Sequence, residues 1–173
     1  REISWQGGGK VATGVVAAAR LGARCAMLGT VGEDLYGQFC LKDFLRHGVD
    51  ITGFQARKDQ TTALSIVISD EQTKGRSIVY HPGTAAPLLS QEINEDMLRN
   101  SRYLFVSNMD EAERHAVKIA RQLGAQVFID ADEYSPELAE ALPSIDLFVA
   151  SEFVYNAMFT DRQYQKNCES ILR

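Results

Sequence analysis

The sequence predicts an α/β protein: a mostly parallel sheet with helices on both faces, together with a small β-sheet that stands apart from it. Two observations predict this class. Short runs rich in Val, Ile, Leu and Phe alternate with helical patterns along most of the chain, and strands buried on both faces read as nearly continuous apolar runs. Residues 61–81 interrupt this alternation with two strand-like runs around a polar connection.

The predicted elements follow in order along the chain. Strands are expected at residues 24–30, 102–107, 126–130 and 146–150, and helices at residues 10–21, 34–47, 110–123 and 137–142. The helix over 110–123 has the clearest ends. Asp110 with Glu113 three residues later forms a variant of the capping box, and Gly124 stands where a helix commonly stops.

The segment over residues 61–81 predicts a β-hairpin. Its two apolar runs, residues 64–69 and 76–81, are joined by the turn-like residues 70–75. The alternating polar and apolar residues of Arg1–Gln6 predict a further strand beside it. We therefore expect one incomplete α/β domain over residues 1–173, with a lid-like sub-domain formed by residues 1–6 and 61–81.

The composition is that of a soluble globular protein. The 173 residues are 45% hydrophobic and 24% charged, the net charge is −5, and the pI is about 5.2. The sequence has no cluster of basic residues and no apolar run long enough to cross a bilayer. Cys25, Cys40 and Cys168 are far apart, which is typical of reduced thiols. We expect a cytoplasmic protein that binds neither nucleic acid nor membrane, with further sequence beyond both ends.

A run of three glycines, Gly7-Gly8-Gly9, predicts a binding site for a small ligand. Without Cβ atoms the backbone can approach a ligand closely, and the helix that follows offers free amide donors. A second glycine-rich segment, Gly29-Thr30-Val31-Gly32-Glu33-Asp34-Leu35-Tyr36-Gly37, follows the next predicted strand. Asp34 opens a helix there, and a structural role at the helix start is sufficient to explain it.

The order of these segments resembles the first signature of the ribokinase-like (pfkB) carbohydrate kinases. In that family a Gly-Gly-x-x-x-Asn loop holds sugar hydroxyls, and Gly-x-Asp-x-x-Gly follows the next strand. Here the first pattern reads Gly8-Gly9-Lys10-Val11-Ala12-Thr13. The resemblance implies a ribokinase-like fold whose β-sheet lid closes over the sugar, and ATP-dependent phosphorylation of a sugar, polyol or nucleoside with ATP and Mg²⁺ as cofactors. The edge of the predicted hairpin needs cover, so we also expect it to pair with the same sheet of another subunit in a homodimer.

The resemblance also implies roles for individual residues. Residues expected at the acceptor are Gly8, Gly9, Lys10, Thr13, Ser107, Ala63 and Tyr80, and residues expected near the nucleotide and Mg²⁺ are Ser151 and Glu152. Two positions depart from the family pattern. Thr13 replaces an asparagine, and the family's Asn-x-x-Glu motif, which helps to organise hydrated Mg²⁺, here begins with Ser151 and ends with Val154.

Several alternatives remain open at the sequence level. Lys10 is either a solvated residue or a donor to the acceptor's oxygens, and Ser107 either faces the sugar or simply ends a strand. The acidic run Asp130-Ala131-Asp132-Glu133 is either a solvated turn or a Mg²⁺ site. A Rossmann-type NAD oxidoreductase requires a buried strand before Gly7. A non-catalytic sugar-binding or regulatory relative is favoured by the departures at Thr13 and Val154.

The family's second motif, Asp-Thr-x-Gly-Ala-Gly-Asp, does not occur in residues 1–173. Its glycine amides balance the phosphoryl charge, and its last aspartate is the base that acts on the acceptor hydroxyl. We therefore expect no catalytic residue in this chain and no phosphorylation by residues 1–173 alone.

Overall fold

A computed structural model of the chain describes residues 3–171. It divides into two compact units. The first contains residues 1–8 and 12–88, and the second contains residues 9–11 and 89–173. Both units combine parallel strands with helices, which confirms the predicted α/β class.

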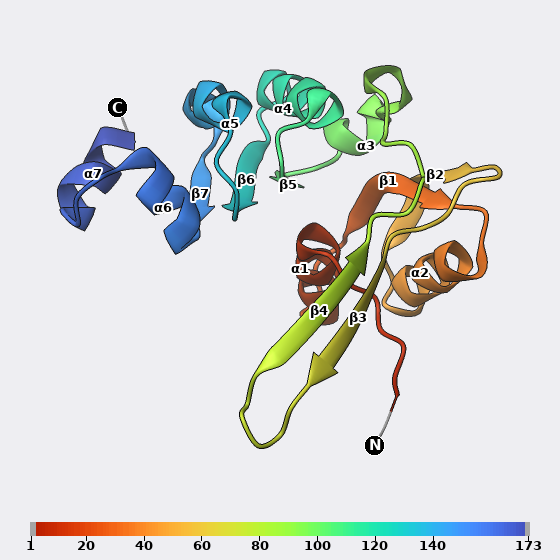
Figure 1. Ribbon diagram of the computed structural model, residues 1–173. Helices are drawn as coiled ribbons and strands as arrows, with labels where there is room; N and C mark the ends of the chain where they lie inside the picture. The colour runs from red at the N-terminus through yellow and green to blue at the C-terminus, as the bar shows by residue number, and fades with distance from the viewer. Residues whose placement is uncertain (1–2, 172–173) are drawn as a thin grey trace. The chain divides into compact units, whose positions relative to one another are not determined.

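The first unit is built on a parallel strand pair, β1 (Ala26–Gly32) and β2 (Asp50–Arg57). Helix α2 (Leu35–Arg46) connects the two strands and packs against both (Figure 1). Helix α1 (Lys10–Arg20) precedes β1, and its first two residues group with the second unit. Strand β2 lies in a stretch for which the sequence predicted no strand, since its polar residues interrupt the apolar run.

An antiparallel hairpin of β3 (Leu64–Ser69) and β4 (Arg76–His81) completes the first unit and confirms the predicted hairpin. Figure 1 shows it as a two-stranded ribbon without a covering helix. All its residues except the half-buried Leu64 are exposed. Six large apolar side chains on the ribbon are more than half exposed: Ile66, Val67, Ile68, Ile78, Val79 and Tyr80.

The predicted strand over residues 1–6 is not present in the part that the structure describes. Residues 3–9 are exposed and belong to no helix or strand, and residues 1–2 lie outside the described residues. The side chain of Trp5 stacks on Tyr36 and meets the edge of Phe39, with ring centroids 5.4 and 5.6 Å away. The prediction is therefore wrong for residues 3–6, because aromatic packing onto α2 holds this segment in place of strand pairing.

The second unit is a parallel sheet of β5 (Tyr103–Val106), β6 (Gln126–Ala131) and β7 (Leu147–Ala150), in that order. The helical segments of this unit are α3 (Glu95–Arg99), α4 (Glu111–Gln122), α5 (Pro136–Ala141), α6 (Glu152–Met158) and α7 (Tyr164–Ile171), with short 3₁₀ turns at Ser90–Glu92 and Leu142–Ser144. The four predicted strands and four predicted helices are thus present with ends shifted by two residues at most.

The hydrophobic core of the second unit lies where α4, α5 and α6 meet the central strand β6. Val127, Ile129 and Val154 are each 0% exposed in this core, which also contains Val106, Met109, Val117, Ala131 and Leu138. Asp110 caps α4 by accepting a hydrogen bond from the Glu113 amide at 2.8 Å, as the capping pattern predicts. The core side of this sheet fixes the positions of the loops that follow each strand.

Within residues 3–171, each helix is too short or too polar to cross a membrane.

Candidate functional site

The glycine loop borders a small cavity in the first unit. The cavity has a volume of about 90 Å³ and is lined by Gly7, Gly8, Ala12, Thr13, Val16, Cys40, Asp43 and Phe44. Two of the predicted acceptor residues, Gly8 and Thr13, therefore lie on one pocket. Burial, and then the nearby charge of Asp43, raise the pKa of the Cys40 thiol, so this thiol stays protonated and is a poor nucleophile.

The three glycines of the loop differ in how much room surrounds them. A Cβ atom at Gly7 would stand 2.6 Å from the Asp43 carboxylate, whereas a Cβ atom at Gly8 would meet no atom within 4 Å. Gly9 has a φ of 98°, a conformation that residues with side chains rarely adopt. Between Gly7 and Gly8, it is Gly8 whose missing side chain leaves open space.

The second glycine segment ties the start of α2 to the base of the hairpin. Asp34 accepts hydrogen bonds from the Gly37 amide at 2.7 Å, the Thr62 amide at 2.8 Å and the Thr62 hydroxyl at 2.8 Å. The Thr62 hydroxyl in turn accepts from the Gly32 amide at 2.9 Å. Although burial raises the pKa of the Asp34 carboxyl, the hydrogen bonds from Thr62 and Gly37 outweigh it and hold that pKa below the usual range.

Gly32 and Gly37 lie beside the hydrogen bonds of Asp34 and allow backbone segments to approach each other closely. A Cβ atom at Gly32 would stand 2.2 Å from the Gln60 carbonyl oxygen, and one at Gly37 would stand 2.1 Å from the Gly32 carbonyl oxygen. Any larger residue at either position would push the two segments apart. The Gly-x-Asp-x-x-Gly segment is therefore a structural joint, and the interpretation of Asp34 as a helix cap is confirmed.

Thr61 and Thr84 close the base of the hairpin. Each amide donates to the other residue's hydroxyl, at 2.9 and 3.1 Å, and the amides of Thr84 and Ala85 also donate to the Thr61 carbonyl. Ala63 and Tyr80, both predicted at the acceptor, are exposed residues of this hairpin region, and Tyr80 pairs with Ser65 across the ribbon. Thr62 was not predicted from the sequence, because its partner Asp34 lies 28 residues away and no local pattern marks such a contact.

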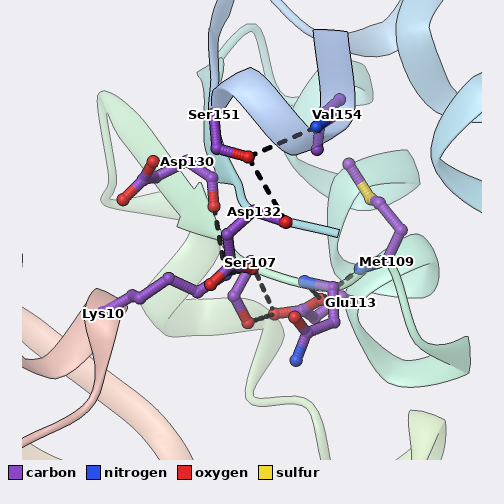
Figure 2. A network of polar contacts seen from close by, with 9 residues as sticks. Lys10, Ser107, Met109, Glu113, Asp130, Asp132, Ser151 and Val154 are labelled. Carbon is purple, nitrogen blue, oxygen red and sulfur yellow. Dashed lines mark hydrogen bonds and ion pairs between the residues drawn. The ribbon is translucent and has the colours of Figure 1, made fainter. Parts of the chain in front are cut away.

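Lys10 is an ion-paired residue. Its ammonium donates to the carboxylate of Asp132 and, at 3.3 Å, to the carbonyl oxygen of Asp130, both in the segment where β6 ends (Figure 2). The Lys10 side chain is 28% exposed, against 58% for Asp132. Lys10 is therefore ion-paired and only partly exposed, and its role as a donor to the acceptor stays a prediction.

Glu113 organises the loop after β5. Its carboxylate accepts hydrogen bonds from the amides of Ser107, Asn108 and Met109, at 2.9, 2.8 and 2.6 Å, and from the Ser107 hydroxyl at 3.0 Å (Figure 2). Met109 is buried with a φ of 57°, a conformation that this set of bonds helps to hold. The Ser107 hydroxyl thus has a structural partner, and Asn108 leaves its exposed side chain at the carboxyl end of β5.

Ser151 and Glu152 lie at the start of α6, after β7. The Ser151 hydroxyl accepts from the Val154 amide at 3.3 Å as a helix cap and donates to the Asp132 carbonyl at 3.3 Å (Figure 2). Glu152 is exposed and has no partner among the described residues. Val154 packs in the core, so at this motif only Glu152 offers a free carboxylate to a hydrated metal ion.

The described residues do not by themselves assemble a metal site. No group of three or more His, Cys, Asp or Glu side chains in residues 3–171 is arranged to hold a metal ion. Mg²⁺ in phosphoryl-transfer sites is commonly bound by the phosphates and waters with only one or two carboxylates. The single carboxylate of Glu152 fits that kind of binding, whereas a cage made by the protein alone does not fit.

The fold of this chain is similar to that of a solved structure. A candidate ribokinase II from E.coli, solved in complex with ATP and Mg²⁺, superimposes with a TM-score of 0.80 at 19% identity, covering 99% of this chain and 61% of that chain. The match identifies the ribokinase-like fold, with its strand and helix order.

The family follows from the sequence model of pfkB family carbohydrate kinases, which matches residues 1–168. The chain belongs to the pfkB family of carbohydrate kinases. It is 27% identical over 134 residues to a 5-dehydro-2-deoxygluconokinase of Clostridium perfringens, covering 72% of this chain and 40% of the relative. It is 28% identical over 131 residues to fructokinase-2 of Solanum habrochaites, covering 71% and 40%. The chain thus spans about two fifths of the length of these relatives.

Proposed function

We propose that the protein carrying this chain transfers the γ-phosphoryl group of ATP to a hydroxyl of a sugar or of a related polyol or nucleoside. Membership of a carbohydrate kinase family supports the reaction class. The observation that carries the acceptor site is the open space at Gly8 beside Thr13 on one small cavity. Residues 3–9 contain no strand, so the buried strand that a Rossmann NAD site needs before Gly7 is absent from the described residues.

In this proposal the described residues bind and position the substrates. We assign acceptor contacts to Gly8, Gly9, Lys10, Thr13, Ser107, Ala63 and Tyr80, and the surroundings of the nucleotide to Ser151 and Glu152. The phosphoryl group would pass to the acceptor oxygen, ADP would leave, and the hydroxyl proton would go to a base that this chain does not contain. Bound Mg²⁺ would balance the phosphate charge. Residues 1–173 alone should therefore show no kinase activity.

Gly8→Val in the full-length protein tests the acceptor site. The Cβ atom of the new side chain would meet no protein atom within 4 Å and would occupy space available to a ligand, so we expect an unchanged fold and a loss of acceptor binding. Ala23→Val, at an exposed residue after α1 that does not line the cavity, is the control for the added valine side chain. Calorimetric titration with the accepted sugar measures the effect, and unchanged affinity in Gly8→Val would refute the assignment.

We further propose that the hairpin β3–β4 is a lid and pairs with its counterpart in a homodimer. The ribbon has exposed apolar side chains on both faces and two strand edges with free backbone groups, a combination that favours pairing with another strand. Val67→Glu at the middle of the ribbon should convert the dimer into a monomer in analytical ultracentrifugation. Glu71→Lys in the turn is the control with an altered charge outside the apolar strands, and a monomeric wild-type protein would refute the dimer.

A non-catalytic, regulatory relative is the second candidate function. It is favoured by Val154, which is buried where the family motif has a glutamate, and by Thr13 in place of asparagine. Binding of the sugar by the full-length protein without phosphoryl transfer in a coupled assay would establish it.

A further inference from the structure

Lys10 carries the only formal charge among the residues assigned to the acceptor. A lysine at such a place could serve an acidic sugar, whose carboxylate needs a cation, or a neutral sugar, whose hydroxyls accept one of its protons. The two uses require different surroundings for the ammonium group. A carboxylate ligand requires an unbalanced positive charge, whereas a hydroxyl ligand requires only a donor.

The surroundings of the Lys10 ammonium are acidic. Its charge is already balanced by the carboxylate of Asp132, and a second bond goes to the Asp130 carbonyl oxygen (Figure 2). The neighbouring Glu133 adds a further negative charge to the same turn. A ligand carboxylate brought to Lys10 would have to displace Asp132 or lie beside it, and both choices lose free energy through desolvation and like-charge repulsion.

We propose that Asp132 determines the class of acceptor: by pairing with Lys10 it selects an uncharged polyhydroxy compound and rejects a sugar acid. Asp132 acts through Lys10 and does not itself contact the acceptor. The ammonium keeps one donor for a neutral hydroxyl after its two bonds to the Asp132 carboxylate and the Asp130 carbonyl are made. This inference rests on the proposed function, because it needs an acceptor bound next to Lys10.

The test compares neutral and acidic acceptors in the full-length protein. The neutral panel contains hexoses, pentoses and hexitols, and the acidic panel contains the aldonic acids of the same carbon skeletons. We expect the wild type to show the higher kcat/KM with a neutral compound. Asp132→Asn removes the balancing charge but keeps the shape, and should move the ratio of acidic to neutral kcat/KM toward the acids by about tenfold or more, as a charge-assisted hydrogen bond would.

Two further variants separate specificity from structure. Asp132→Glu keeps the charge and should retain the wild-type ratio, even if its rates fall. The double variant Lys10→Gln with Asp132→Asn removes both charges. It should lose the increase in the ratio of acidic to neutral kcat/KM that Asp132→Asn shows. A merely structural role of Asp132 would lower rates with both panels alike and leave the ratio unchanged. An unchanged ratio in Asp132→Asn, or a wild type that prefers acids, would overturn the inference.

Binding measured without ATP distinguishes a failure of the acceptor-class inference from a failure of the kinase proposal. Calorimetric titration of the wild type with the same panels should give binding of neutral compounds only. Neutral binding without phosphoryl transfer would refute the kinase proposal and leave the acceptor class supported. Transfer to acids in preference to neutral compounds would support the kinase and refute the acceptor class, and binding of neither panel would refute both.

Discussion

The hairpin β3–β4 and the sheet β5–β6–β7 are both made of hydrogen-bonded strands rich in Ile and Val, yet their surroundings are opposite. In the sheet, Val127 and Ile129 are 0% exposed, whereas Ile68 and Val79 in the hairpin are 60% and 61% exposed. Helices α4 and α6 pack against the sheet, and none covers the ribbon (Figure 1). The sheet is therefore stabilised by apolar burial, and the hairpin depends on the polar joint formed at its base by Asp34, Thr62 and the Thr61–Thr84 pair.

The largest effect is expected from Val154→Glu, which would place a carboxylate in the core of the second unit. Val154 is 0% exposed among apolar side chains, so a charge there would lack a partner. We expect a loss of about 4 kcal/mol or more in the free energy of unfolding, a large part of the stability of an ordinary domain. The substitution restores the residue type of the family motif but places it in the core. It should therefore abolish activity because the protein unfolds.

Denaturant unfolding of the full-length protein measures this loss. Asn156→Glu introduces the same charge at an exposed position of the same helix, and should change stability by less than about 0.5 kcal/mol. A Val154→Glu protein as stable as this control would show that position 154 faces solvent.

A matched pair of isoleucines sharpens the comparison itself. Ile129→Ala removes a fully buried side chain from the sheet and should cost about 2–5 kcal/mol. Ile68→Ala removes the same atoms from the exposed ribbon and should cost less than about 1 kcal/mol. Equal losses in chemical denaturation would mean that the ribbon is covered in the full-length protein, for example by the proposed dimer contact, which unfolding at several protein concentrations would reveal.

A smaller and more local effect is expected at the base of the hairpin. Thr62→Val keeps the shape of the side chain but removes the hydroxyl that links Asp34 to the Gly32 amide. Leaving these groups without a partner should cost about 1–3 kcal/mol, borne mainly by residues 60–84. Hydrogen exchange should show faster exchange in the hairpin amides and unchanged exchange in β5–β7. Thr160→Val, at an exposed residue outside the hairpin, is the control, and unaltered hairpin protection in Thr62→Val would refute the joint.

The smallest effect is expected from lowering the pH, which protonates Asp34. The folded pKa of Asp34 lies below its ordinary value of 3.8, so its bonds contribute stability that is fully present above that pH and is lost as the pH falls through the folded pKa. The amide signals of Gly37 and Thr62 should therefore shift together below about pH 3.8 in an NMR titration. In Asp34→Asn the shared transition should vanish. Its persistence in that variant would mean that another carboxylate causes it.

Local patterns predicted most of the fold and a smaller part of the candidate site. Asp110 and Asp34 each cap a helix by accepting a hydrogen bond from the amide three residues later. A contact over such a short distance is visible as a spacing in the sequence. The family resemblance placed the glycine loop, and Gly8 and Thr13 do share a cavity. The partners of Lys10 and Asp34 could not be predicted, because Asp132 and Thr62 lie 122 and 28 residues away in the chain.

The expected strand before the glycine loop failed for a related reason. The alternation of polar and apolar residues up to Gln6 is a fair strand pattern, but a strand also needs a neighbour to pair with. Trp5 instead finds the rings of Tyr36 and Phe39 on α2. Such aromatic contacts depend on the folded arrangement of the helix, which no spacing within residues 1–6 can indicate.

Because the hydrogen bonds that hold the hairpin are at its base, a rotation there would move its tip the most. Six extended residues reach about 20 Å, since each adds roughly 3.3 Å, and the bonds at Thr61, Thr62 and Thr84 are all at one end of that length. A rotation of about 10° at this pivot would carry the tip through roughly 3.5 Å. Small rearrangements around Asp34, of the size of one lengthened hydrogen bond, would thereby move the far end of the ribbon by more than the diameter of a water molecule.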